Sequence, residues 1–194
     1  MRRQARGILR QLGLSAAVAM ALCGFVGGAQ PKAKEPEPLP ARQFQLRLNA
    51  YLKLRAKLVA GAGRLKPTDS QQAIAARSQL LARKIRAARA GARVGDIFTP
   101  AVTAEFRRLI GISLQGKDAE QIRASLKSAE PVTLPLGVND PYPNSIPLQS
   151  TPPSLLLNLP QLPKEVDYRV VGGKLILRDV EANLILDIIP DVVV

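Results

Sequence analysis

The chain has 194 residues, a formal net charge of +13, no His, no Trp and a single Cys. Without an imidazole, Ser-His-Asp triads and His-based acid–base catalysis are excluded, and one Cys cannot form a disulfide within the chain. Transition-metal sites need imidazole or thiolate ligands, so the sequence predicts no metal site and no cofactor.

The first 29 residues have the pattern of a bacterial signal peptide. Four arginines without acids precede the apolar run 12–26, and residues 27–29 are small, as signal peptidase requires. The run is shorter than the roughly 20 residues that cross a bilayer, which favours cleavage over a membrane anchor. We therefore expect cleavage after Ala29 and export to the periplasm or cell envelope.

Two other export signals fit the leader less well. Cys23 lies late in the apolar run, as a lipid-modified Cys would, but Leu22 stands where lipoprotein signals carry a small residue. Arg2-Arg3 could belong to a twin-arginine signal, although the flanking residues lack the surroundings of that motif.

Composition divides the rest of the chain into segments. Residues 30–41 carry four prolines and predict a disordered or extended tether. A helical region, 42–128, holds 18 Lys and Arg against 5 acids, and is followed by a proline-rich extended bridge, 129–165, and a β-meander, 166–194. We expect 42–194 to fold as one domain, with acids in the majority after residue 128.

Four helices are predicted in the basic region. Apolar spacing and breakers place them at about 42–60, 68–90, 100–112 and 118–127. Thr68 with Gln71 has the spacing of a capping box, and Thr99-Pro100 combines an N-cap with a proline at the first helical position. The second helix should bury Ile74, Leu81, Ile85 and Ala88 on one face.

The C-terminal part predicts extended structure. Nine prolines between Pro131 and Pro163 argue against helix and central strand, while the many leucines between them predict that the bridge packs on the domain. Three β-rich runs follow at 168–171, 174–180 and 184–189. The fold class predicted is therefore α+β, with a small antiparallel meander at the C-terminus.

The first hairpin of the meander has a predictable register. A two-residue turn at Gly172-Gly173 pairs Val171 with Lys174, which places Asp167 opposite Arg178.

The second hairpin is expected to have a loop with an even number of residues. That loop would pair Leu177 with Ile188, and Arg178 with Asp187 in an exposed row of charges. An odd loop would instead place Asp187 beside Leu177 on the apolar face, where an unpaired carboxylate is costly.

A basic face of the second helix is the candidate interaction surface. Its cations recur at helical spacing and could bind phosphates or an anionic lipid surface; they are Arg83, Lys84, Arg86, Arg89 and Arg93. The alternative interpretation is a solvated face, neutralised in part by the acidic C-terminal half.

Three acids are the candidates for carboxylate chemistry. Asp179, Glu181 and Asp187 could serve hydrolysis or bind a hard cation, but their spacing is not specific. Acids beside turns and on exposed strand faces are ordinarily solubilising residues.

Several motifs carry a resemblance. The chain resembles uncharacterised exported bacterial proteins through the order of its leader, residues 95–98 (GDIF), 159–163 (LPQLP), 168–172 (YRVVG) and 175–179 (LILRD). Residues 159–189 are also faintly similar to the C-terminal region of periplasmic nickel and cobalt homeostasis proteins. This second resemblance implies the strand arrangement alone, because the chain after Ala29 has no His and no Cys to bind nickel.

These observations favour a non-catalytic exported protein that binds an anionic envelope surface or another envelope protein. The alternatives are a carboxylate-based envelope enzyme, or a basic nucleic-acid-binding protein if the leader is not cleaved. Low aromatic content argues against a base-stacking platform for nucleic acid.

Overall fold

The computed structural model describes residues 38–62, 70–127, 135–143 and 152–192, all within a compact unit that spans residues 36–194. The predicted signal peptide and most of the predicted tether lie outside the described residues. In the described part, no helix is long and apolar enough to span a membrane.

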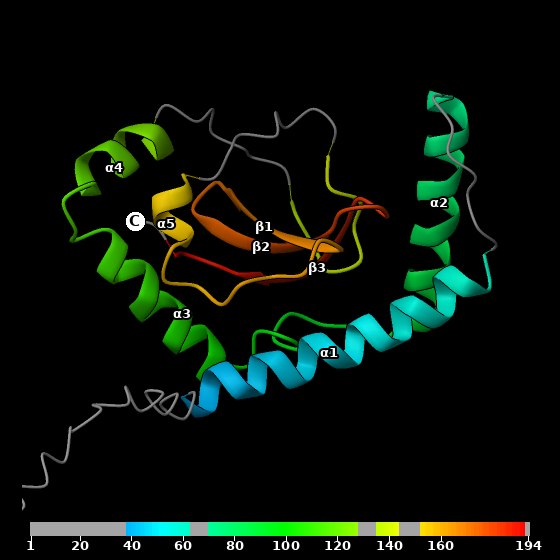
Figure 1. Cartoon of the computed structure of the whole chain (residues 1–194), viewed down its shortest axis with the longest axis horizontal. Coiled ribbons are helices and arrows are strands. Elements are labelled where there is room, and N and C mark those ends of the chain that lie inside the picture. The colour runs from blue at the N-terminus through cyan, green and yellow to red at the C-terminus, as the bar shows by residue number, and fades with distance from the viewer. Residues whose placement is uncertain (1–37, 63–69, 128–134, 144–151, 193–194) are drawn as a thin grey trace, which may run out of the picture. The chain divides into compact units, whose positions relative to one another are not determined.

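The fold is α+β, as predicted: helices in the N-terminal part precede a three-stranded antiparallel sheet (Figure 1). The sheet has the meander order β1-β2-β3. The helices are α1 (Leu39–Ala60), α2 (Gln71–Ala88), α3 (Pro100–Ser113), α4 (Ala119–Lys127) and α5 (Pro153–Leu156), and the strands are β1 (Val166–Val171), β2 (Lys174–Asp179) and β3 (Leu184–Ile189).

Two helix starts differ from the prediction. Helix α1 begins three residues early, because proline in the first turn of a helix loses no hydrogen bond. Helix α2 begins at Gln71 and not at Thr68: Ser70 is its N-cap, and the Ser70 hydroxyl accepts a hydrogen bond from the Ala73 amide at 3.3 Å.

The proline-rich bridge contains a helix that the prolines were expected to exclude. Helix α5 begins at Pro153, where the first turn again tolerates proline. Its Leu155 is fully buried and Leu159 is nearly so. The described part of the bridge therefore packs on the domain, and one turn of helix places Leu155 in the core.

The main core lies between the helices and one face of the sheet. Four aromatic rings form its centre, with neighbouring ring centroids 5.0 to 6.5 Å apart; they are Phe44 of α1, Phe98, Phe106 of α3 and Tyr168 of β1. Helix α1 packs against α3 and α2, which lie toward its two ends in Figure 1.

The other face of the sheet is covered by part of the bridge. Tyr142 and Leu136 pack there on Ile176, Ile185 and Ile188. Asn139 and Asp140 form backbone hydrogen bonds with Ile185 of β3 at 2.8 and 2.9 Å, and the Tyr142 amide donates to the Asn183 carbonyl, just before β3, at 2.8 Å. This segment satisfies the outward-facing backbone groups of Ile185 at the outer edge of β3.

The register of the first hairpin is confirmed. Strands β1 and β2 pair Val171 with Lys174 and Asp167 with Arg178, as the two-glycine turn requires. Both turn glycines have positive φ, at 53° and 75°.

The register predicted for the second hairpin is wrong. The loop 180–183 has an even number of residues, but the register shifts beyond Arg178, which pairs with Ile185, while Leu177 pairs with Asp187. A β-bulge on β3 accounts for the shift. The expected row of exposed charges therefore ends at Arg178, which is itself buried.

Asp187 lies on the apolar face of the sheet, but its carboxylate is not left without hydrogen-bond donors. It is fully buried, and its carboxylate accepts hydrogen bonds from the amides of Gly95, Ile97, Phe98 and Ile188 at 2.7 to 2.9 Å. The sequence argued against this register because burying a carboxylate is costly, but that free-energy cost applies only when the carboxylate has no partner.

Candidate functional site: an arginine-lined groove

A groove of about 950 Å³ opens between α2, residues 141–143 and the turn that joins β2 to β3. We call it the arginine groove, because Arg77, Arg83 and Arg86 of α2 and Arg178 of β2 line it, and Glu181 is the one carboxylate among the described lining residues. Arginine offers a planar fork of donors that suits carboxylates and phosphates.

Glu181 joins two arginines from different helices. Its Oε1 accepts from Arg77 Nε at 3.1 Å, and its Oε2 accepts from Arg55 Nη2 at 2.8 Å. The arginine side chains are 8 and 10% exposed, whereas the side chain of Glu181 is 39% exposed. The carboxylate thus lies at the groove surface and covers guanidinium groups buried beneath it.

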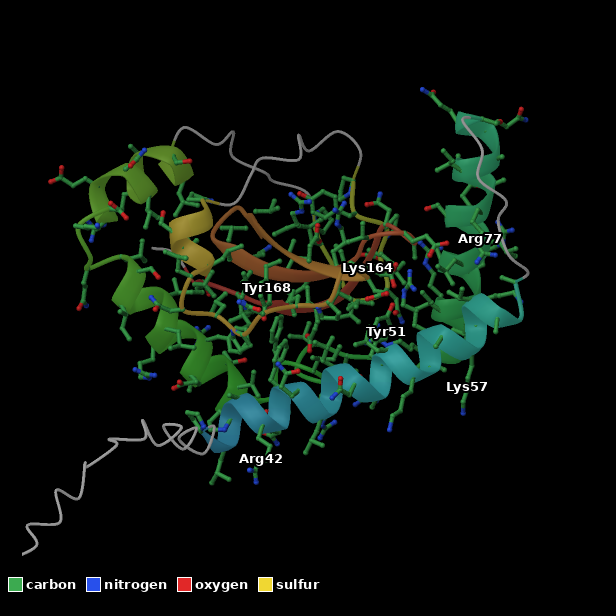
Figure 2. All side chains as sticks on the ribbon, viewed as in Figure 1. Arg42, Tyr51, Lys57, Arg77, Lys164 and Tyr168 are labelled. Carbon is green, nitrogen blue, oxygen red and sulfur yellow. The ribbon has the colours of Figure 1, made fainter. Side chains whose placement is uncertain are left out.

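A buried network continues below Glu181. Asp179 Oδ2 accepts from Arg55 Nε at 2.7 Å and from the Tyr51 hydroxyl at 2.6 Å, and Asp179 Oδ1 accepts from the Ala182 amide at 2.7 Å. Burial, reinforced by the Asp179 carboxylate, raises the pKa of Tyr51 far above its ordinary value. Tyr51 and Arg77 come from α1 and α2 (Figure 2), so the network ties both helices to the β2–β3 turn.

Arg178 is held by the sheet itself. Its guanidinium donates to both oxygens of Asp167 at 3.0 and 2.7 Å and to Asn183 Oδ1 at 3.0 Å. It also lies 5.1 Å from the ring centroid of Tyr142, a cation–π arrangement. Burial raises the pKa of Tyr142, so its hydroxyl stays neutral at the groove wall.

The predicted basic face of α2 divides between several surroundings. Arg83 and Arg86 line the groove, and Arg86 donates to the Asn139 carbonyl at 2.8 Å. Arg83 is exposed and makes no hydrogen bond or ion pair with the described residues.

The other three predicted cations do not line the groove. Lys84 donates to the Gly61 carbonyl at 3.0 Å, and Arg93 is exposed beyond the end of α2. Arg89 donates to Asn139 and to the Leu186 carbonyl, and its guanidinium lies 5.4 Å from the ring centroid of Tyr51. Intramolecular pairing with acids of the C-terminal half is thus seen for Arg55 and Arg77. Arg89 binds uncharged polar groups of the same C-terminal part.

The groove also has apolar walls. Ile74 was expected in the core of α2 but is 49% exposed and lines the groove, as does Val180, which is 43% exposed. Pro141 and Pro143 line it as well. The surface therefore combines arginine donors with aliphatic side chains at the same opening.

The three candidate carboxylates do not converge on one site. Asp179 and Asp187 are fully buried, and each is bound by several hydrogen-bond donors, while Glu181 binds two arginines. Among the described residues, no group of three or more Cys, Asp or Glu is placed to hold a metal ion. These carboxylates act as acceptors that stabilise the fold.

Sequence reasoning missed most of the groove. Arg77 and Arg178 lie on separate elements about 100 positions apart, and only the fold brings them together. The one available signal was the position of Glu181 in a turn directly after a strand that ends in Arg178-Asp179.

Comparisons with protein-family models, curated proteins and solved structures find no match to the chain. The residues of the arginine groove are therefore the basis for the function proposed below.

Proposed function

We propose that this is a non-catalytic exported protein that binds an anionic partner in the arginine groove. The observation that carries the proposal is that, among the described residues, four arginines and one carboxylate line the same concave opening. The resemblance to uncharacterised exported bacterial proteins described above supports export but adds no activity.

The electrostatics of the groove favour an anion. Arg77, Arg86 and Arg178 are anchored by hydrogen bonds, so little side-chain entropy is lost when a ligand binds. Arg83 has no such partner in the described part of the chain and can give its full donor set to a ligand. A concave site also excludes more water than a flat face, which strengthens charge pairing.

The test uses Arg83→Ala, since Arg86 and Arg89 bond to backbone carbonyls and their loss would disturb the fold. Binding of polyphosphate and of phosphatidylglycerol vesicles should weaken about threefold to fivefold, as expected for one exposed ion pair, with a shallower dependence on salt.

Arg42→Ala is the matched control. Arg42 is an exposed arginine near the start of α1, well separated from Arg77 in Figure 2, and its removal lowers the net charge equally. Equal loss of binding in both variants would show that total charge, and not the groove, binds the anion.

Export is the second part of the proposal and is supported by the leader sequence. The protein expressed in a bacterium should be recovered from the envelope fraction, and its mass should equal that of a chain that begins at Gln30. A full-length cytoplasmic protein would overturn this part and revive the nucleic-acid alternative.

A further inference from the structure

The groove already binds one carboxylate, and it belongs to the chain itself. Glu181 accepts from Arg77 and Arg55 at 3.1 and 2.8 Å, yet 39% of its side chain is exposed. A carboxylate from outside can therefore approach the place that Glu181 occupies. Arg55 would keep its bond to Asp179 Oδ2, and Arg77 its bond to the Ala62 carbonyl, if Glu181 turned away.

The walls beside this carboxylate position are aliphatic. Ile74 and Val180 are both about half exposed, and Pro141 and Pro143 line the same groove. A ligand with a carboxylate next to an aliphatic group matches this arrangement of arginine and aliphatic side chains. Acidic side chains next to aliphatic ones in an extended peptide have this chemistry.

We propose that the arginine groove binds an acidic peptide segment of a partner protein, and that a carboxylate of the partner takes the place of Glu181 on Arg77. This inference rests on the proposed anion-binding function and names its ligand. Glu181 then acts as an internal competitor, so that only a peptide that also reaches Arg83 and the aliphatic walls displaces it.

A peptide fits the groove better than the other polyanions. Nucleic acid binding without sequence preference uses aromatic platforms, and the ring of Tyr142 in this groove is covered by the Arg178 guanidinium. A bilayer surface contacts a flat or convex basic face, whereas these arginines surround a hollow.

Glu181→Gln tests the competitor. The amide keeps the shape of the side chain but removes its charge, so an incoming carboxylate competes with a neutral group for Arg77 Nε. The probe is a fluorescently labelled peptide rich in Glu and Leu, whose affinity should rise about tenfold in this variant, equivalent to about 1.4 kcal/mol. The same peptide with Gln in place of every Glu should not bind either protein.

Glu120→Gln is the matched control. Glu120 is exposed on α4, which lies far from α2 in Figure 1, so its removal raises the net charge without changing the groove. Its peptide affinity should equal that of the wild type. If Glu120→Gln and Glu181→Gln strengthen binding equally, net charge accounts for the effect and the exchange on Arg77 is wrong.

A spectroscopic measurement on the wild type covers the case in which Glu181→Gln does not fold. The Nε–H resonance of Arg77 should shift on peptide addition, while that of Arg108, which is bonded to Glu105 elsewhere, should not. If the Arg77 resonance does not shift at saturating peptide, the proposed replacement of Glu181 by a carboxylate of the peptide is wrong.

The two proposals fail in different ways. If polyphosphate or vesicles bind with dependence on Arg83 but the acidic peptide does not, the peptide assignment is wrong and the anion-binding function stands. If no anion binds with dependence on Arg83, both are wrong.

Discussion

Asp187 shows how a buried charge can be accommodated by backbone groups alone. Its two oxygens together accept four amide hydrogen bonds, three of them from the loop 95–98. Gly95 has a φ of 94°, which other residues rarely adopt, and this conformation contributes one of the donors. The carboxylate therefore fixes the loop between α2 and α3 on the sheet.

We predict that Asp187→Asn strongly destabilises the protein. One carboxylate oxygen would become an NH₂ group facing two amide donors, so hydrogen bonds are lost and buried N–H groups remain unpaired. The free energy of unfolding should fall by about 2 to 5 kcal/mol, measured by urea denaturation.

Asp191→Asn provides the control for this substitution. Asp191 is exposed and has a φ of 49°, a conformation that Asn accepts readily, so its replacement should change stability by less than about 0.5 kcal/mol. Similar effects of the two substitutions would contradict the role given to Asp187.

At the scale of elements, the sequence predicted those features that depend on neighbouring residues alone. The two-glycine turn determined the first hairpin, because its length leaves one register open. Pro100 similarly placed the start of α3 at the residue expected. In both cases the signal and its consequence lie within a few residues of each other.

The second hairpin could not be predicted in the same way. An aspartate within the apolar run 184–189 was placed on the exposed face because nothing nearby could bond to it. Three of its four donors come from residues about 90 positions earlier, and they make the bulged register favourable. The error thus arose from a tertiary contact, which strand periodicity does not contain.

Helix α2 shows the same limit for the candidate site. The sequence places its basic residues at helical spacing, but their surroundings depend on the segments that pack on either side. Residues 139–142 bind Arg86 and Arg89, while the β2–β3 turn binds Arg77. Only Arg83 among the α2 arginines retains an unpaired guanidinium in the described structure.

In the described structure, several arginines of the basic helices find their partners in the C-terminal part of the chain. Arginines of the basic helices bond to acids or carbonyls of the C-terminal part, and among the described residues no buried side-chain nitrogen or oxygen lacks a hydrogen-bond partner. The uneven distribution of charge along the sequence therefore stabilises the association of the two halves. Removing one partner of such a buried pair costs more than the pair itself contributes.

The absence of His gives the molecule a simple response to pH. No side chain has an ordinary pKa between about pH 5 and 8, so stability should be flat there. The alkaline range differs, because burial raises the pKa of each of the three tyrosines, Tyr51, Tyr142 and Tyr168. A raised pKa in the folded state means that the unfolded chain loses these protons first.

Stability should accordingly be complete below pH 10 and fall as pH rises above it, where tyrosines ionise in the unfolded chain but stay protonated in the folded one. Each tyrosine contributes a slope of up to about 1.4 kcal/mol per pH unit. Tyr168→Phe removes one such group, together with the hydrogen bond from its hydroxyl to the Pro160 carbonyl. Urea denaturation at a series of alkaline pH values should therefore give a slope shallower by about that amount in the variant, with lysine ionisation cancelling between the two proteins. Equal slopes would show that Tyr168 ionises at its ordinary pKa in the folded protein, and that its burial in the aromatic core is not maintained in solution.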